Sequence, residues 1–149
     1  MELLHGGNVM VMGTRSEKLM AHVSWAFGAR VTPDRRSVTV FLHHAFSSAP
    51  LANLRGNKRI ALTVANPATH ECYQFKGDVT SEGPASPDGR TVSELHVTKL
   101  AAKLGQKYAN FERFFDHFEP GPPHAVTFVP REIYDQTPGP NAGRSVEMD

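Results

Sequence analysis

The 149-residue sequence has little of several features that mark particular classes of protein. Its single cysteine, Cys72, excludes an intrachain disulfide framework and a cysteine-rich metal site. Sixteen basic and fifteen acidic side chains give a net charge of +1, which does not indicate nucleic acid or a membrane as a partner. Because neither a signal peptide nor a long apolar run is visible, we expect a cytoplasmic protein.

Signatures of common enzyme classes are also missing. The sequence contains no Walker or Rossmann glycine pattern and no Gly-x-Ser-x-Gly nucleophile elbow. Its eight histidines lie at positions 5, 22, 43, 44, 70, 96, 117 and 124. Their spacing is not typical of zinc, and His43 and His44 are expected to point to opposite faces of a strand. We therefore expect no metal site.

The segments that remain predict one mainly β domain with a minor share of helix. Alternating and β-branched segments predict six strands, at residues 8–14, 19–31, 37–43, 60–65, 71–77 and 125–129. The fifth could extend to Ser81, before a surface loop at 82–89, and the last could continue past Pro130 to Tyr134. The turn at 32–36 is expected to pair the strand of Trp25 with the strand of Val38. Without βαβ alternation, the pattern favours an antiparallel barrel with helices at its side.

Two late helices are expected after these strands. The first begins at Thr91 or Ser93 and ends at Gly105. The second carries an aromatic stripe at Tyr108, Phe111, Phe115 and Phe118, which we interpret as core packing. A shorter helix of at most two turns is expected at 51–57.

The central stretch from Ser37 to Gly77 is the best candidate for a binding site. A strand ends at His43 and runs into a turn with two hydroxyls, Ser47 and Ser48, before the short helix. A helix start offers unpaired N–H groups and the positive end of the helix dipole, so it can hold an anionic group. The two hydroxyls could equally satisfy N–H groups of the turn itself.

The order of several segments in this stretch resembles a known family. These segments are Val38–His43, Ser47–Ser48, Leu51–Leu54, Arg59–Thr63 and Tyr73–Gly77. Together they resemble the FMN-binding split-barrel proteins related to pyridoxamine 5′-phosphate oxidase, over roughly residues 3 to 137. The resemblance implies a six-stranded antiparallel split barrel with flanking helices as a single domain at 1–137, followed by a C-terminal tail at 138–149. It also implies a homodimer with FMN sites at the subunit interface.

The resemblance further implies which residues contact the cofactor. The backbone of residues 22–25 would follow the isoalloxazine ring, although Trp25 is itself expected in the core. The candidate cofactor-binding residues are His22, Val23, Ser24, Trp25, His43, His44, Ser47, Ser48, Asn53 and Gln74. For Asn53 and Gln74, an ordinary surface position is an equal alternative, and one of the two histidines could be exposed and the other packed.

The sequence departs from the family at the phosphate turn. Ala49 and Pro50 stand where the family usually carries Lys and Arg. A flavin-dependent oxidoreductase with a small-molecule substrate remains the preferred function, with haem-binding, non-catalytic and deazaflavin-dependent members of the scaffold as alternatives. The vitamin B6-binding residues of the true oxidase are not visible, so that activity is not expected. No catalytic residue is assigned, and residues 136–143 are the candidate contribution of a second subunit.

Overall fold

The computed structural model describes residues 2–117 and 121–147, apart from the side chains of residues 112, 115 and 117. The strands in this part of the chain are β1 (Val9–Arg15), β2 (Ala21–Ala26), β3 (Ala29–Val31), β4 (Val38–Leu42), β5 (Arg59–Ala65), β6 (Cys72–Pro84), β7 (His124–Asp135) and β8 (Arg144–Val146). The helices are α1 (Glu2–His5), the 3-10 helix η1 (His44–Phe46), α2 (Ser48–Asn57), α3 (Pro87–Gly105) and the 3-10 helix η2 (Phe111–His117).

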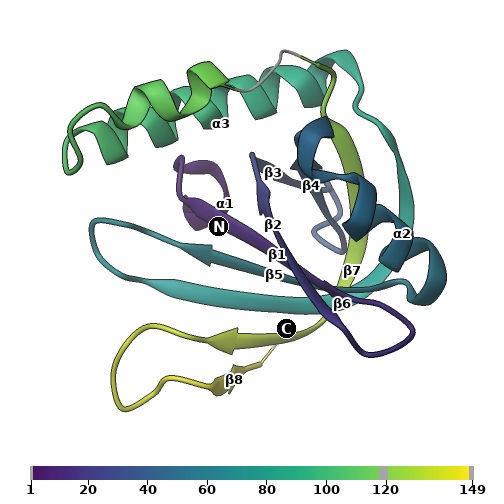
Figure 1. Ribbon diagram of the computed structural model, residues 1–149. Helices are drawn as coiled ribbons and strands as arrows, with labels where there is room; N and C mark the ends of the chain where they lie inside the picture. The colour runs from purple at the N-terminus through teal and green to yellow at the C-terminus, as the bar shows by residue number, and fades with distance from the viewer. Residues whose placement is uncertain (1, 118–120, 148–149) are drawn as a thin grey trace.

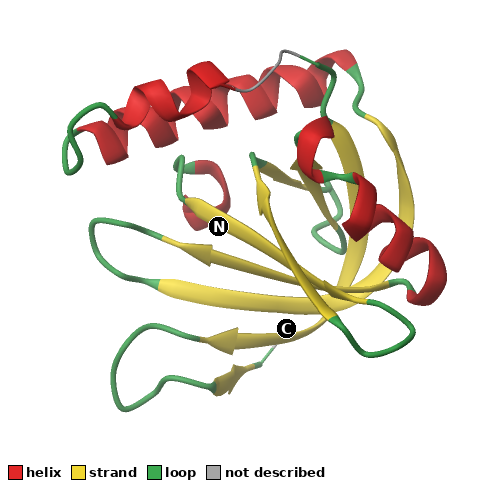
Figure 2. Cartoon of the chain, viewed as in Figure 1, coloured by secondary structure: helices red, strands yellow, loops and turns green. Residues whose placement is uncertain are grey.

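All the described strands belong to one curled antiparallel sheet (Figure 1; strands in yellow in Figure 2). Its order is β2-β1-β5-β6-β7-β4-β3, and β8 pairs with β7 outside this path. The two ends of the path, β2 and β3, are joined in the chain by Phe27 and Gly28. There the Phe27 amide donates to the carbonyl of Phe41 at 2.8 Å, and the Phe41 amide donates to Gly28 at 3.0 Å. The junction therefore brings the two ends of the sheet together.

The predicted antiparallel, mainly β architecture is confirmed, but the described residues form eight strands instead of six. Gly28 has a φ of +109°, a conformation that side chains disfavour, and it divides the expected strand 19–31 into β2 and β3. Residues Arg144–Val146, within the expected tail, form β8 against β7. The expected pairing of Trp25's strand with that of Val38 is wrong, because β2 pairs with β1 and only β3 pairs with β4.

The helix starts also differ from the prediction. The chain stays extended to Pro84, and α3 begins at Pro87, where the Ser86 hydroxyl accepts a hydrogen bond from the Gly89 amide at 3.2 Å. A serine cap followed by proline in the first turn is a common helix start. The helix ends at Gly105 as predicted. Likewise α2 begins at Ser48, three residues earlier than expected.

The second predicted helix is replaced by the short η2. The two described side chains of its expected aromatic stripe do not lie in the core, because Tyr108 is 53% exposed and Phe111 is only half-buried. The side chain of Phe115, and Phe118 altogether, lie outside the described residues. None of the described helices is long and apolar enough to cross a lipid bilayer.

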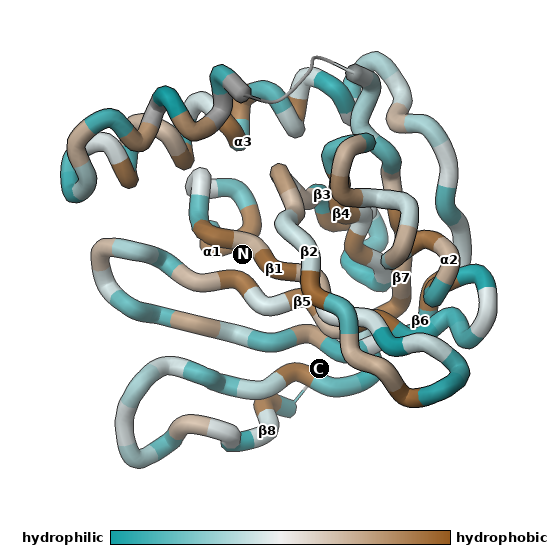
Figure 3. Tube along the Cα trace, in the orientation of Figure 1, coloured by the Kyte–Doolittle hydropathy of each residue, from teal (hydrophilic) through white to brown (hydrophobic). Residues whose placement is uncertain are grey.

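The core fills the inside of the curled sheet, where alternate residues of each strand point inward. Met12 on β1 and Leu62 on β5 are register partners, and both are fully buried. Leu51 and Leu54 of α2 close one side of this cluster. In Figure 3 hydrophobic residues gather along β1, which supplies Met10 and Met12 to this core.

Candidate functional site

The end of β4 and the start of α2 form the centre of the candidate site. The chain leaves its extended conformation after Leu42, and His43 caps η1 by accepting a hydrogen bond from the Ala45 amide at its Nδ1 atom, at 3.2 Å. The rings of His43 and His44 lie 4.3 Å apart between centroids. The prediction that these histidines point to opposite faces is therefore wrong, because they no longer belong to a strand.

The two serines of the turn have different surroundings. Ser47 is buried, and its hydroxyl donates to the carbonyl of His44 at 2.8 Å. This bond is the local turn chemistry that was the alternative to a ligand contact. Ser48 is exposed and is the first residue of α2. Of the two hydroxyls, Ser48 is thus the one that faces solvent at the helix start.

Aromatic side chains from four segments meet beside this turn and form what we call the aromatic cluster: Trp25, Phe27, His43, Phe46 and Phe114. The ring of Trp25 is stacked 6.5 Å from that of Phe27 and lies 6.2 Å from that of Phe114. Phe27 meets His43 edge to face at 6.3 Å and lies 6.4 Å from Phe46. These separations are typical of attractive ring pairs.

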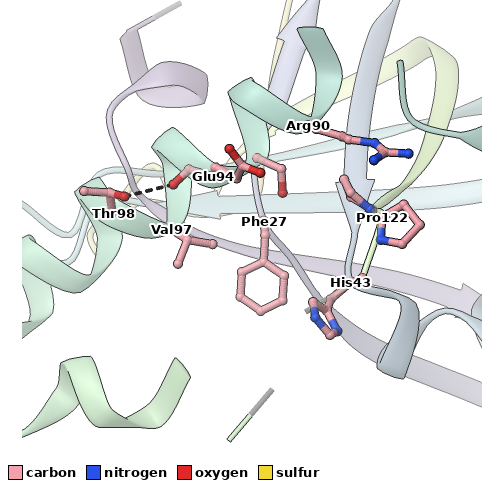
Figure 4. Close-up of a pocket in the computed structure, with 10 residues that line it drawn as sticks. Phe27, His43, Arg90, Glu94, Val97, Thr98 and Pro122 are labelled. Carbon is pink, nitrogen blue, oxygen red and sulfur yellow. Dashed lines mark hydrogen bonds between the residues drawn. The ribbon is translucent and has the colours of Figure 1, made fainter. Parts of the chain in front are cut away.

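The aromatic cluster borders a pocket of about 640 Å³, here called the α3 pocket (Figure 4). Its lining residues are Phe27, His43, Arg90, Ser93, Glu94, Val97, Thr98, Gly121, Pro122 and Pro123. Arg90, Glu94 and Thr98 follow one another at single-turn intervals along α3. The Thr98 hydroxyl donates to the carbonyl of Glu94 at 3.0 Å. The pocket therefore combines an aromatic wall with a polar helix face.

Sequence reasoning missed most of the α3 pocket. It placed Phe27 within a continuous strand and started the helix after Arg90, so the polar stripe of α3 was not considered. The spacing of Arg90, Glu94 and Thr98 could have indicated one helix face. Because a solvated face has the same spacing, this signal alone could not identify a site.

The predicted residues of β2 lie apart from the α3 pocket. His22 and Val23 are exposed, whereas Ser24 faces the interior, where its hydroxyl has no hydrogen-bond partner among the described residues. Trp25 is half-buried and is not part of the core, contrary to expectation. Of this segment, Trp25 alone reaches the aromatic cluster, through its contact with Phe27.

Asn53 and Gln74 each bond to a threonine of a neighbouring element. The Asn53 amide donates to the Thr14 hydroxyl at 3.0 Å, which ties α2 to β1. The Gln74 amide donates to the Thr63 hydroxyl at 3.2 Å on β5. Neither residue lines the α3 pocket. Their predicted contacts with a cofactor remain predictions.

One buried titratable group holds α3 against the sheet. His96 is 4% exposed and lies over Gly28, with its Nε2 atom unpaired among the described residues. Burial lowers the pKa of His96 to about 4, and Lys99 and Lys103 add to the shift, while a hydrogen bond to the Asn8 backbone opposes it. His96 is therefore neutral at neutral pH. Among the described residues no group of three metal-ligating side chains converges.

Comparisons with known proteins identify the fold. No protein-family model matches the chain, and no curated protein matches it significantly. Among solved structures, HupZ of Group A Streptococcus is 14% identical, with 96% of each chain covered and a TM-score of 0.58. A pyridoxamine 5′-phosphate oxidase-related, FMN-binding protein of Nostoc punctiforme is 13% identical over 94% of this chain and 83% of that chain, with a TM-score of 0.52. HutZ, the haem storage protein of Vibrio cholerae, is 12% identical over 90% and 89%, with a TM-score of 0.50.

The fold is that of the pyridoxamine 5′-phosphate oxidase-related split barrels. The resemblance read from the sequence is confirmed at this level. At 12 to 14% identity, the likeness concerns the fold alone.

Proposed function

We propose that this protein binds FMN and acts as a flavin-dependent oxidoreductase on a small molecule. The observation that carries the proposal is the aromatic cluster bordering a pocket of about 640 Å³, next to the start of α2. This volume lies within the usual range for cofactor and substrate pockets, roughly 300–1,000 Å³. A solved protein of the same fold is described as FMN-binding, which supports the choice of cofactor.

The ring part of FMN fits the residues that are present. An isoalloxazine is a planar aromatic system, which stacks favourably on aromatic side chains. The half-buried His43 offers such a surface on the wall of the α3 pocket, the buried Phe27 packs behind it, and the half-buried Trp25 extends the cluster outward. The backbone of residues 22–25 remains our proposed partner for the edge of the ring.

The residues at the start of α2 fit the phosphate group of FMN less well than the aromatic cluster fits its ring. The Ser48 hydroxyl and the unpaired N–H groups at the start of α2 are suited to an anion, and the exposed His44 adds positive charge when protonated. Ala49 and Pro50 provide no cation, and Pro50 provides no N–H group. We therefore propose Ser48 and His44 as the phosphate contacts and expect moderate affinity.

When bound, FMN would supply hydride transfer chemistry, so the chain itself need not contribute an acid or a base. Phe27 and Val97 would exclude water from the reacting centre. Arg90 and Glu94 would orient polar groups of the substrate, because they face the pocket from successive turns of α3. Their opposite charges favour a substrate that carries both an acidic and a basic or hydroxyl group.

We also propose a homodimer with two equivalent sites. Leu19, Met20 and Val23 on the β1–β2 hairpin are 73%, 69% and 67% exposed, and exposed apolar side chains of this size often mark an interface. A second copy of the chain is the simplest partner, because a two-fold axis would bury both hairpins together. The segment 136–143 is our candidate for completing the partner's site.

A haem-binding role is the second candidate. The half-buried His43 lies at the wall of the α3 pocket, where its imidazole would hold the haem iron. The same fold is found in a protein described as a haem storage protein.

Absorption spectroscopy separates the flavin-binding function from the haem-binding function. After FMN is added and the protein is dialysed, we expect two flavin absorption bands. Their intensity should correspond to about one FMN per subunit. A strong violet band after addition of haem, with no retained flavin, would favour the second candidate instead.

A charge placed at the phosphate turn tests the site. Ser48→Asp should weaken FMN binding by about tenfold or more, or about 1.4 kcal/mol, because it places a carboxylate beside the phosphate. Ser86→Asp is a matched control, since Ser86 is an exposed serine at the start of another helix, α3. Titrations with FMN, followed by flavin fluorescence, should show a loss of FMN affinity for Ser48→Asp and none for Ser86→Asp. Equal affinities in both variants would exclude this turn as the phosphate site.

A further inference from the structure

Four cationic side chains surround a second hollow on the outer face of the sheet, which we call the basic groove: Arg15, Arg59, Lys76 and Arg131. They come from β1, β5, β6 and β7, which are neighbours in the sheet (Figure 1). The groove encloses about 490 Å³. It is lined in addition by Gly13, Thr14, Ile60, Ala61, Gly77 and Glu132. The lining residues differ from those of the α3 pocket at every position.

A β-bulge places one of these cations. Lys76 pairs with Glu132, but the next residue, Gly77, pairs with Pro130, so Arg131 is the extra residue of β7. Bulges redirect side chains in this way. Arg131 thereby reaches the groove, and its Nε atom donates to Asp78 at 2.9 Å.

Asp78 holds two arginines at the edge of the groove. Its Oδ1 atom forms an ion pair with Arg59 Nη1 and its Oδ2 atom accepts a hydrogen bond from Arg131 Nε, both at 2.9 Å. Each guanidinium has five N–H donors, so these bonds orient the arginines and leave most of their donors for other partners. Both side chains remain well exposed, at 64% and 63%. The arginines are therefore oriented and accessible.

Positive charge is concentrated here although the whole chain is almost neutral. Four cations face two carboxylates, Asp78 and Glu132, whereas the chain has a net charge of +1. Lys76 is exposed, with its ammonium 4.6 Å from the centre of the Tyr134 ring. On α2, the Asn57 amide donates to the carbonyl of Arg15 at 2.6 Å and fixes the end of β1.

The base of the basic groove contains two small residues, Gly13 and Ala61. A Cβ atom added to Gly13 would have its nearest neighbour, the Ala61 carbonyl, at 3.7 Å, so nothing crowds this surface. Together with Ala61, the glycine allows a ligand to lie close to the backbone. Because the groove has small residues at its base and arginines at its edge, it suits a compact anion better than an apolar ligand.

We propose that the basic groove binds a phosphorylated small molecule, at a site separate from the α3 pocket. Planar guanidinium groups match the oxygens of phosphate in two-bond pairs, and a groove of about 490 Å³ suits a molecule of nucleotide size. A bounded hollow on an almost neutral chain does not suit an extended nucleic acid. The proposal does not depend on whether FMN binds.

Isothermal titration of the full chain with inorganic pyrophosphate tests this site. We expect binding of one pyrophosphate per chain. The double substitution Lys76→Gln and Arg131→Gln should weaken it by about tenfold or more, because two of four cations are removed. The matched control, Arg35→Gln with Arg36→Gln, removes the same charge from the exposed turn before β4. Its affinity for pyrophosphate should stay within about twofold of that of the unsubstituted protein. All titrations are made at one ionic strength, so that screening is equal.

Several results would overturn the proposal. The first is an absence of pyrophosphate binding. The second is an equal loss of pyrophosphate affinity in the groove and control variants. The third is a loss of pyrophosphate affinity caused by Arg90→Gln in the α3 pocket. Loss of FMN binding to the α3 pocket in the double groove variant, with Ser48→Asp unable to weaken it further, would show that the two sites are not separate. If the double variant does not fold, Lys76→Gln alone decides the question, because Lys76 is an exposed strand residue. Retained affinity in that variant would count against the groove.

Discussion

The α3 pocket and the basic groove are built from the same sheet by different means. The α3 pocket joins Phe27, His43 and α3, which are far apart in the chain, through packing of rings and a helix. The basic groove takes residues from four neighbouring strands, whose places are fixed by backbone pairing. The first therefore depends on tertiary docking and the second on strand register. Perturbations should affect them separately.

The largest effect should come from the bulge beneath the basic groove. A Cβ atom at Gly77 would lie 2.3 Å from the Val129 carbonyl and 2.8 Å from the Phe128 ring. Gly77→Ala must therefore separate β6 from β7 and should cost about 4 kcal/mol of stability, at the upper end for single substitutions. Urea unfolding monitored by circular dichroism measures this loss.

A second glycine of β6 provides the control. A Cβ atom at Gly83 would have no neighbour within 4 Å among the described residues, so Gly83→Ala should have almost no effect. Similar changes in stability in both variants would mean that the close contact of Gly77 with β7 is not what determines the loss. The role that we assign to the bulge would then be wrong.

Acid should weaken the packing of α3 against the sheet, through His96. The pKa of His96 is about 4 in the folded protein, against an ordinary value of 6.5. Between these values the unfolded chain binds a proton that the folded chain does not, so stability falls as the pH falls from about 6.5 to 4. The contribution of His96 to this loss should reach about 3 kcal/mol. Urea titrations at several pH values measure it.

Two variants separate His96 from the other titrating groups. His96→Gln should remove most of the pH dependence in this window, although it lowers stability at neutral pH. His5→Gln, at an exposed histidine that lines the same small cavity as His96, should leave the dependence unchanged. An unaltered pH dependence in His96→Gln would show that another group is responsible.

A smaller effect is expected where α2 connects the two regions. Asn53 bonds to Thr14, and Thr14 lines the basic groove. Asn53→Ala should cost about 1 kcal/mol, the usual value for one such hydrogen bond. A double-mutant cycle with Thr14→Val measures the coupling directly, and additive effects would show that the bond contributes nothing. FMN affinity in Asn53→Ala tests its predicted cofactor contact at the same time.

The sequence allowed most strands to be predicted, because each contains either an alternating, β-branched segment or a short continuous apolar run. It did not reveal the division at Gly28, since a glycine inside an apolar run also fits an unbroken strand. It also placed the start of α3 too late, because Ser86 and Pro87 fit both a loop and a capped helix start. These errors share one cause, namely that a local pattern allowed two structures and tertiary contacts decided between them.

The candidate site was predictable only in part. His43, Ser48 and the start of α2 could be found because they follow one another in the chain. Arg90 and Glu94 could not, since they reach the pocket only through the docking of α3 over Gly28. The basic groove was equally hidden, because its cations lie on four strands and one of them depends on a bulge.

The junction at Phe27 and Gly28 has a consequence for how the protein can associate. A strand at the end of an open sheet offers unpaired amide and carbonyl groups, to which another chain can add a strand. Here the chain passes directly from one end of the sheet to the other, and Phe41 pairs with both residues of the junction. At this point the sheet's own backbone occupies the groups that a foreign strand would use, so another chain cannot add a strand at the junction.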